Sequence, residues 1–144
     1  GGGLMSGTAI AAKGIDARIL AIAAEPEGAR DGHDSLKSGS RITGRAANTI
    51  SDGLRAELGP LTFSILREHC DDVLLVDDAE TVAAMRLVWE RLKIVIEPSC
   101  AVPLAAVLKY RERFAGLRIG IILSGGNVDL DALPALLALA PPNA

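Results

Sequence analysis

Apolar residues along the chain follow two patterns, helical spacing and short continuous runs. Residues 4–13 have the helical spacing, and Gly14 is expected to cap this helix at its carboxy end. Residues 17–24, 72–76 and 118–123 are nearly continuous apolar runs, which is typical of buried strands in a parallel sheet. The first run is expected to end at Glu25-Pro26, because proline cannot donate to a strand ladder.

Helices are predicted between and after these strands, at residues 62–69, 78–92, 101–114 and 131–139. Asp77 or Asp78 is expected to cap the second of them, and Pro103 is expected in the first turn of the third, where proline is tolerated. One face of the second helix is predicted to be core, namely Val82, Met85, Val88, Trp89 and Leu92.

The remaining segments give weaker patterns. Residues 94–96 are β-branched and indicate a brief strand. Residues 27–60 are polar and predict a short helix with loops, including a turn at residues 49–53. Pro141-Pro142 is expected to end the ordered pattern.

Helices that alternate with short apolar strands indicate an α/β fold, a mainly parallel sheet flanked by helices, with ligands at the carboxy ends of the strands. Of 144 residues, 49% are hydrophobic but only one Trp, one Tyr and two Phe occur, so we expect a core of Ala, Leu, Ile and Val. The net charge of −3 and the absence of a basic face argue against nucleic acid, and no apolar run has membrane-spanning length. Cys70 and Cys100 are interpreted as reduced thiols of a cytoplasmic protein.

The run Gly1-Gly2-Gly3-Leu4-Met5-Ser6-Gly7 leads directly into the first helix. A glycine turn before a helix directs free N–H groups at a close neighbour, which favours an anion such as phosphate. The spacing is neither that of a Walker A loop nor Gly-x-Gly-x-x-Gly, so a tight connection and a phosphate site both remain open. Because a turn of this kind normally follows a strand, we expect the chain to be the carboxy-terminal portion of a longer or split protein.

Six stretches, taken together and in order, resemble one family, the pyridoxal-phosphate enzymes of fold type II that include serine/threonine dehydratases and serine racemase. They are the glycine run, Ala24-Glu25-Pro26, Thr49-Ile50-Ser51-Asp52-Gly53, Trp89-Glu90-Arg91, Ile96-Glu97-Pro98-Ser99 and Leu123-Ser124-Gly125-Gly126-Asn127-Val128-Asp129-Leu130. The resemblance implies that residues 1–144 are the carboxy-terminal part of the large, cofactor-binding domain, with the amino-terminal half absent.

The resemblance also implies a set of cofactor-binding residues. Backbone N–H groups of Gly1, Gly2, Gly3, Leu4 and Met5 would hold the phosphate of pyridoxal 5'-phosphate. Ser124 would hydrogen-bond the pyridine nitrogen, and the pocket would include Gly53, Glu97, Gly125 and Asn127. Composition alone would make residues 124–127 a strand-ending turn.

A divalent-cation site is implied in the same way. Glu25, the Ala29 carbonyl and Asp31 match a hard oxygen set for Mg²⁺, or for Ca²⁺ or Mn²⁺, and Gly28 is expected to relax the turn. The bare sequence would instead place two acids of a polar loop on the solvated surface. Arg91 and Lys93 are interpreted as a solvated helix face.

No lysine here matches the Schiff-base lysine of the family, so no catalytic residue is assigned and the isolated chain is expected to be inactive. The implied reaction removes water from a 3-hydroxy amino acid and gives a 2-oxo acid and ammonia, with the amino-terminal half as partner and a homodimer as the assembly. The alternatives are a serine or hydroxyaspartate racemase/dehydratase and a non-catalytic scaffold of the same family. Without the resemblance, a Rossmann-like nucleotide binder would remain.

Overall fold

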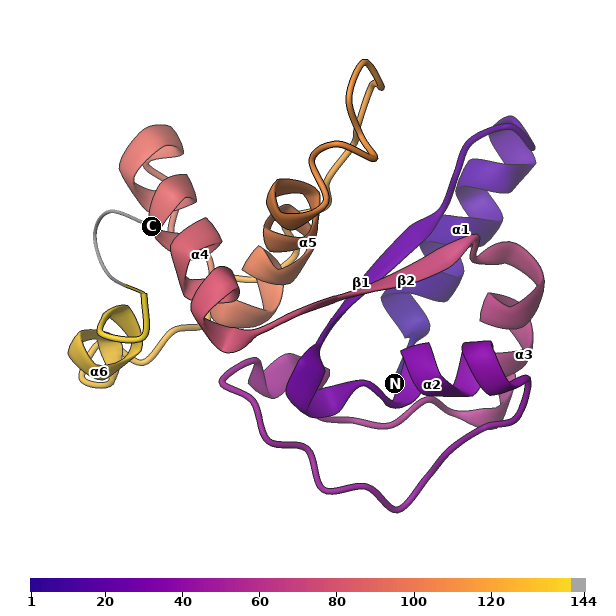
Figure 1. The fold of residues 1–144 in the computed structure, drawn as a ribbon, viewed down its shortest axis with the longest axis horizontal. Coiled ribbons are helices and arrows are strands. Elements are labelled where there is room, and N and C mark those ends of the chain that lie inside the picture. The colour runs from indigo at the N-terminus through magenta and orange to yellow at the C-terminus, as the bar shows by residue number, and fades with distance from the viewer. Residues whose placement is uncertain (141–144) are drawn as a thin grey trace.

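A computed structural model describes residues 1–140 (Figure 1). The first half contains helix α1 (Gly3–Ile15), strand β1 (Ile22–Pro26), the 3₁₀ turn η1 (Glu27–Ala29), helix α2 (Asp31–Ser38) and the 3₁₀ turn η2 (Asp52–Leu54). It is followed by α3 (Pro60–His69), β2 (Asp72–Val76), α4 (Asp78–Leu92), α5 (Pro98–Lys109) and α6 (Leu133–Leu137). The predicted end at Pro141-Pro142 lies outside the described residues.

The α/β class is confirmed, with a small parallel sheet. In the described part of the chain the sheet has two strands, β1 and β2, whose register runs from Ile22 opposite Asp72 to Pro26 opposite Val76. Figure 1 shows α1, α2 and α3 around one end of this pair and α4, α5 and α6 at the other. None of the helices in residues 1–140 is long and apolar enough to cross a bilayer.

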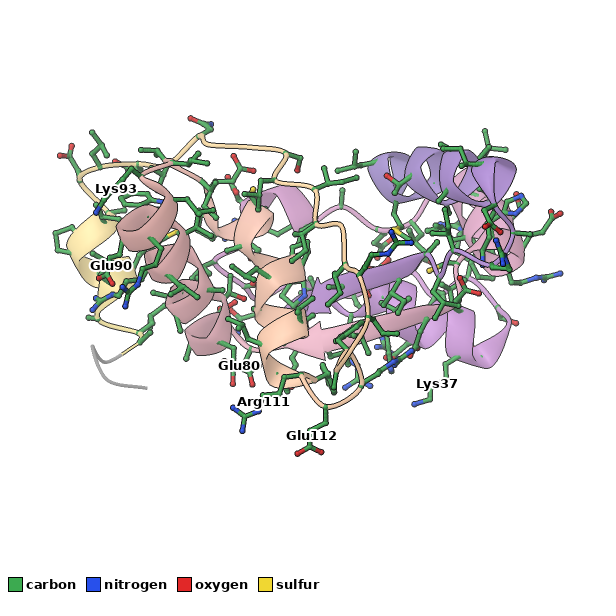
Figure 2. All side chains as sticks on the ribbon, turned by 90° about the horizontal axis from the view of Figure 1, so that it is seen from above. Lys37, Glu80, Glu90, Lys93, Arg111 and Glu112 are labelled. Atoms are coloured by element: carbon green, nitrogen blue, oxygen red, sulfur yellow. The ribbon has the colours of Figure 1, made fainter. Side chains whose placement is uncertain are left out.

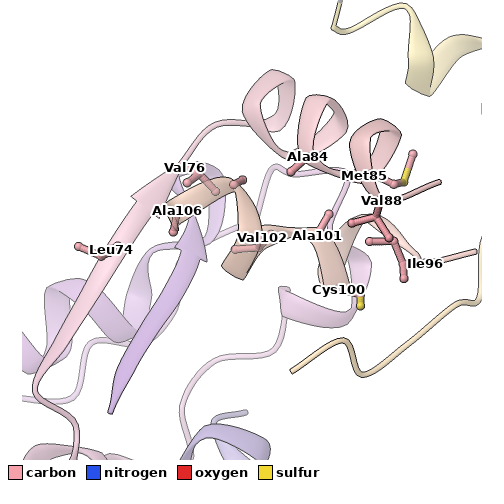
Figure 3. Close-up of a cluster of buried hydrophobic side chains, with 11 residues drawn as sticks. Leu74, Val76, Ala84, Met85, Val88, Ile96, Cys100, Ala101, Val102 and Ala106 are labelled. Carbon is pink, nitrogen blue, oxygen red and sulfur yellow. The ribbon is translucent and has the colours of Figure 1, made fainter. Parts of the chain in front are cut away.

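The core lies where β2 meets α4 and α5 (Figure 3). Leu74 and Val76 come from β2, and Met85, the largest fully buried side chain, comes from α4. The α5 side contributes small residues, including Cys100, Ala101, Val102, Ala105 and Ala106. Small side chains let α5 approach α4 and the sheet closely, and this fixes the position of the amino end of α5.

The helix predictions hold with shifted ends. Asp77 caps α4 in a capping box with Glu80, and α4 ends at Leu92 as predicted, although Leu92 itself is 57% exposed and is not core. Helix α1 continues through Gly14 to Ile15. Helix α5 begins at Pro98, so Pro103 lies in its second turn rather than its first. There, proline removes the hydrogen bond to the Ser99 carbonyl.

The strand predictions were less accurate. Strand β1 starts at Ile22 rather than at residue 17; it ends at Pro26 as predicted, although Pro26 itself is still paired with Val76. Proline is tolerated because β1 is paired on one side only within the described residues. Residues 94–96 and 118–123 form no strand, and Ile119 and Ile122 are 44% and 48% exposed. A strand needs a neighbour for its backbone groups, and these runs have no ladder partner in residues 1–140.

Candidate cofactor-binding site

The amino end of α1 has the geometry of an anion site. Gly2 is the N-cap residue with φ +81°, a left-handed conformation that favours glycine, and no side chain caps the helix. The N–H groups of Gly3, Leu4 and Met5 belong to the first turn and have no partner within the helix. A helix of 13 residues therefore presents free donors and its positive dipole end at this point.

The glycine run packs against the segment that follows η2. The Gly1 amino group donates to the Ala56 carbonyl at 2.8 Å, and the Thr62 hydroxyl donates to the Gly1 carbonyl at 2.7 Å. A Cβ atom on Gly2 would lie 2.6 Å from Leu58 Cδ2. The run is therefore fixed by contacts with residues 56–62, a few residues beyond Gly53.

A second group of predicted residues meets at the amino end of α5. The Glu97 N–H donates to the Gly125 carbonyl at 3.1 Å, and the Asn127 N–H donates to Glu97 Oε2 at 2.9 Å. A Cβ atom on Gly125 would lie 2.6–2.7 Å from the Glu97 carboxyl atoms, so glycine is required for this approach. Glu97 thus forms one unit with Gly125 and Asn127, although it lies 30 residues before Asn127 in the sequence.

Gly53 joins the same group through Ser99. Its N–H donates to Ser99 Oγ at 3.0 Å and to Asp52 Oδ1 at 2.9 Å. A Cβ atom on Gly53 would lie 3.0 Å from Ser99 Oγ and 3.6 Å from Glu97 Oε1. The structure therefore brings Gly53, Glu97, Gly125 and Asn127 together, and exposed Ser124 precedes Gly125. Residues 53–62 connect this group to the glycine run.

Two buried hydroxyls in these segments have no hydrogen-bond partner within residues 1–140. They are Ser6 Oγ, in the first turns of α1, and Ser51 Oγ, directly before Asp52 and Gly53. An unpaired buried hydroxyl costs about 1–3 kcal/mol, so such groups are usually found where something else supplies a partner. Their location on the two predicted cofactor segments fits a site for a polar ligand.

Sequence reasoning assigned no role to Ser99 or to Ser6, whereas the resemblance implied that Ser51 lies, with Asp52 and Gly53, in a pocket segment. Ser99 was part of a matching stretch, and its place at the second position of a helix behind Pro98 was the only signal for a role. That the Ser6 and Ser51 hydroxyls are buried without a partner becomes visible only in the folded chain.

Glu25 belongs to β1, and its carboxylate contacts the amino end of α2, close to the second predicted metal ligand. Its Oε2 accepts the His33 N–H at 2.8 Å, and a Cβ atom on Gly32 would lie 2.3 Å from its Oε1. Asp31 is buried at 7% exposure, and its Oδ2 accepts the Leu58 N–H at 2.9 Å. Two acids that were expected at the surface on composition alone are thus held inward by backbone N–H groups.

The donor set for a cation is small. No group of three or more His, Cys, Asp or Glu side chains in residues 1–140 could hold a metal ion. The predicted set has only two carboxylates, Glu25 and Asp31, and depends on the carbonyl of Ala29, a buried residue of η1. Magnesium, like Ca²⁺, accepts carbonyl and water oxygens beside carboxylates, so the set fits a hard cation with water in its shell. The metal stays a prediction.

Burial raises the pKa of the Glu25 carboxyl from 4.5 to about 7, and the Asp31 charge adds to the rise. The native state then binds more protons than the unfolded state between these values, so the free energy of unfolding should fall as pH rises from 4.5 to about 7 and level off above. In metal-free buffer we expect a loss of about 2–3 kcal/mol across this window. Urea unfolding of Glu25→Gln, which mimics the protonated form, should show a smaller loss; equal pH profiles would contradict the prediction.

Replacement of Gly125 by alanine should displace the Glu97 carboxylate and break its hydrogen bond from Asn127. Because this side chain can move, the expected cost is only about 1 kcal/mol in the free energy of unfolding. Hydrogen exchange at the Asn127 amide should become faster. Gly120→Ala is the matched control, since nothing lies within 4 Å of a Cβ atom there. Unchanged exchange in Gly125→Ala would show that the close approach is not needed.

The lysines of the chain are not among the residues that form the candidate cofactor-binding site. Lys13 pairs with Asp71 at 2.7 Å, and Lys109 pairs with Glu80 at 2.9 Å. In Figure 2, Lys93 lies at the α4 end of the molecule and Lys37 near the opposite end. Arg91 and Lys93 are exposed, in agreement with a solvated helix face. That the Schiff-base lysine belongs to another segment stays a prediction.

Comparison with known proteins identifies the family of the chain. The sequence profile of the family described as "Pyridoxal-phosphate dependent enzyme" matches residues 1–125. The chain is 50% identical to a serine racemase of Dictyostelium discoideum over 95% of this chain and 44% of that protein. It is 48% identical to a beta-hydroxyaspartate dehydratase of Paracoccus denitrificans, over 93% and 42%.

A solved structure shows the same fold. The structure of maize serine racemase superposes with a TM-score of 0.87 and 48% identity, covering 96% of this chain and 44% of that one. The chain thus spans less than half the length of these relatives. Since the family profile covers most of the chain and the fold agrees, the chain belongs to the pyridoxal-phosphate dependent enzymes.

Proposed function

We propose that this chain is the carboxy-terminal part of the cofactor-binding domain of a dehydratase. The enzyme would remove water from a 3-hydroxy amino acid and release a 2-oxo acid and ammonia. The observation that carries the proposal is the meeting of Gly53, Glu97, Gly125 and Asn127 at the amino end of α5, joined through residues 56–62 to the uncapped end of α1.

The residues of the chain would hold pyridoxal phosphate, which supplies an electron sink for the bonds of the substrate α-carbon. The free N–H groups of Gly3, Leu4 and Met5 would bind its phosphate, as the absence of a side-chain cap on α1 supports. Gly53 and Glu97 would line the pocket, because their close packing against Ser99 and Gly125 fixes their positions.

Ser124 would face the pyridine nitrogen. A neutral hydroxyl forms a hydrogen bond there without adding the charge that a carboxylate partner would bring, so the ring stays a weaker electron sink. This favours elimination over chemistry that needs a long-lived carbanion. The exposure of Ser124 within the described residues is consistent with a hydroxyl that faces a ligand or another segment.

The relatives support two types of reaction, elimination and racemisation. A beta-hydroxyaspartate dehydratase at 48% identity favours elimination, and a serine racemase at 50% identity supports racemisation of serine as the second candidate. Serine, threonine and 3-hydroxyaspartate therefore all belong in the assay. A homodimer and a cytoplasmic location stay predictions.

We also propose that Glu25, the Ala29 carbonyl and Asp31 bind a divalent cation. The burial of Asp31 beside Glu25 supports this, because two neighbouring carboxylates away from bulk water gain from a shared positive charge. Millimolar Mg²⁺ or Ca²⁺ should raise the melting temperature of the chain, and Glu25→Gln should remove the increase. No cation-dependent change in the wild type would contradict the site.

The function is tested by mixing the chain with pyridoxal phosphate, alone and with the lysine-bearing amino-terminal half of the enzyme. Visible absorbance reports lysine-bound cofactor, while 2-oxo acid release and the chirality of remaining serine separate dehydratase from racemase. We expect an absorbance band and 2-oxo acid only in the mixture. If the two halves fold together and neither the absorbance band nor 2-oxo acid appears, the dehydratase proposal fails and the non-catalytic scaffold remains.

A further inference from the structure

One carboxylate joins the turn at residues 49–53 to the first turn of α4. Asp78 Oδ1 accepts a hydrogen bond from the Thr49 hydroxyl at 2.6 Å, and Asp78 Oδ2 accepts one from the Ile50 N–H at 3.2 Å. Both oxygens of a single half-buried side chain thus hold two consecutive residues of the turn.

The hydroxyl oxygen and the carbonyl of Thr49 accept further hydrogen bonds. Its hydroxyl oxygen accepts the Ser51 N–H at 3.1 Å, and its carbonyl accepts two hydrogen bonds from the Arg55 guanidinium, at 3.1 and 2.6 Å. Thr49 is 5% exposed and Ser51 is fully buried. Hydrogen bonds to acidic and guanidinium side chains are among the stronger ones in proteins, and Thr49 makes both kinds, so Thr49 is the fixed point of the turn.

Thr49 is connected to Gly53 through a few hydrogen bonds within the turn. The Ile50 carbonyl accepts the Asp52 N–H at 3.0 Å, and the Ser51 carbonyl accepts the Leu54 N–H at 3.0 Å. The Gly53 N–H then donates to Ser99 Oγ at the start of α5. Asp78 is thus linked to Gly53 through the covalent backbone of the turn and these hydrogen bonds.

Helices α4 and α5 share the main core, so Asp78 and Ser99 belong to one rigid pair of helices. We propose that Asp78 is a positioning residue: through Thr49 and Ile50 it sets the distance between Gly53 and the amino end of α5. The inference rests on the proposed function, since it takes Gly53 and Glu97 as two walls of the cofactor pocket.

The test compares Asp78→Ala with Asp77→Ala. The two carboxylates are adjacent at the same helix end, but the Asp77 carboxylate accepts its hydrogen bond from the Glu80 N–H, within the first turn of α4. Both variants lose one charge and weaken the start of α4, and only Asp78→Ala releases the turn. Asp78→Glu keeps a carboxylate and is expected to restore part of the effect.

Two measurements are made on each variant. Hydrogen exchange at the Gly53 and Leu54 amides of this chain reports the turn without any cofactor, and should become about tenfold faster in Asp78→Ala alone. The Kd for pyridoxal phosphate is then measured on the enzyme reconstituted with its lysine-bearing half. It should rise about tenfold in Asp78→Ala and less than about twofold in Asp77→Ala.

The outcomes separate this inference from the proposed function. Equal exchange rates in Asp78→Ala and wild type would overturn the inference, as would faster exchange with an unchanged Kd. If the wild-type enzyme binds no cofactor at all, the proposed function fails and the positioning role fails with it. Equal effects of Asp77→Ala and Asp78→Ala would also overturn the inference, because Asp78 would then only stabilise the start of α4.

Discussion

Gly28→Ala should destabilise the chain by about 3 kcal/mol, because a Cβ atom at this position would lie 1.8 Å from the carbonyl oxygen of Asn48. That neighbour is backbone and cannot rotate away as a side chain would. The two segments are also joined by a hydrogen bond from the Asn48 N–H to the Gly28 carbonyl at 2.8 Å. Alanine would have to separate them and break this bond, which adds about 1 kcal/mol.

Urea unfolding monitored by circular dichroism measures the effect, with Gly14→Ala as control. Gly14 lies inside α1 with nothing within 4 Å of a Cβ atom, so alanine there should stabilise the chain by up to about 1 kcal/mol. A Gly28→Ala chain as stable as wild type would show that the contact with Asn48 is not close in solution. The same substitution should weaken any cation effect, since Gly28 lies between Glu25 and Ala29.

Met85→Ala should cost about 2–5 kcal/mol in the free energy of unfolding. Met85 on α4 is completely buried and belongs to the same cluster as Val88, Ile96 and Val102 (Figure 3). Much of the surrounding core consists of alanine and valine, short side chains that cannot extend into the cavity left by a methionine. The cost should therefore fall in the upper half of the range.

Leu92→Ala is the matched control for this prediction. Leu92 lies on the same helix and shares the predicted apolar face, but it is 57% exposed, so truncation should cost less than about 1 kcal/mol. Chemical denaturation of both variants decides the comparison. Similar losses for Met85→Ala and Leu92→Ala would place the packed core elsewhere along α4.

Much of the site could be predicted because its signals are local. The glycine run before α1, the capping box of Asp77 and Glu80, and Pro98 at the start of α5 each depend on a few consecutive residues. The identity of the family came from six such stretches in order. The grouping of Gly53, Glu97, Gly125 and Asn127 was implied by resemblance only, since nothing in their spacing brings residues this far apart together.

Gly28 shows the limit of local reasoning. It was expected to relax a turn, yet it is not among the glycines with positive φ, and space for the Asn48 carbonyl is what requires it. The burial of Asp31 and the partial burial of Glu25 were likewise beyond composition, which favoured a solvated loop. In each case the neighbour that matters is distant in sequence: Asn48 for Gly28, and Leu58 for Asp31.

The sequence alone determined the α/β class, the Asp77 cap of α4 and the family. Tertiary structure alone decided that Pro26 is paired, that residues 118–123 form no strand in the described chain, and that Asp78 holds Thr49. The physical reason is the range of the interactions. Helical hydrogen bonds and caps join residues three or four apart, whereas strand pairing, close approach and carboxylate contacts join residues that only folding brings together.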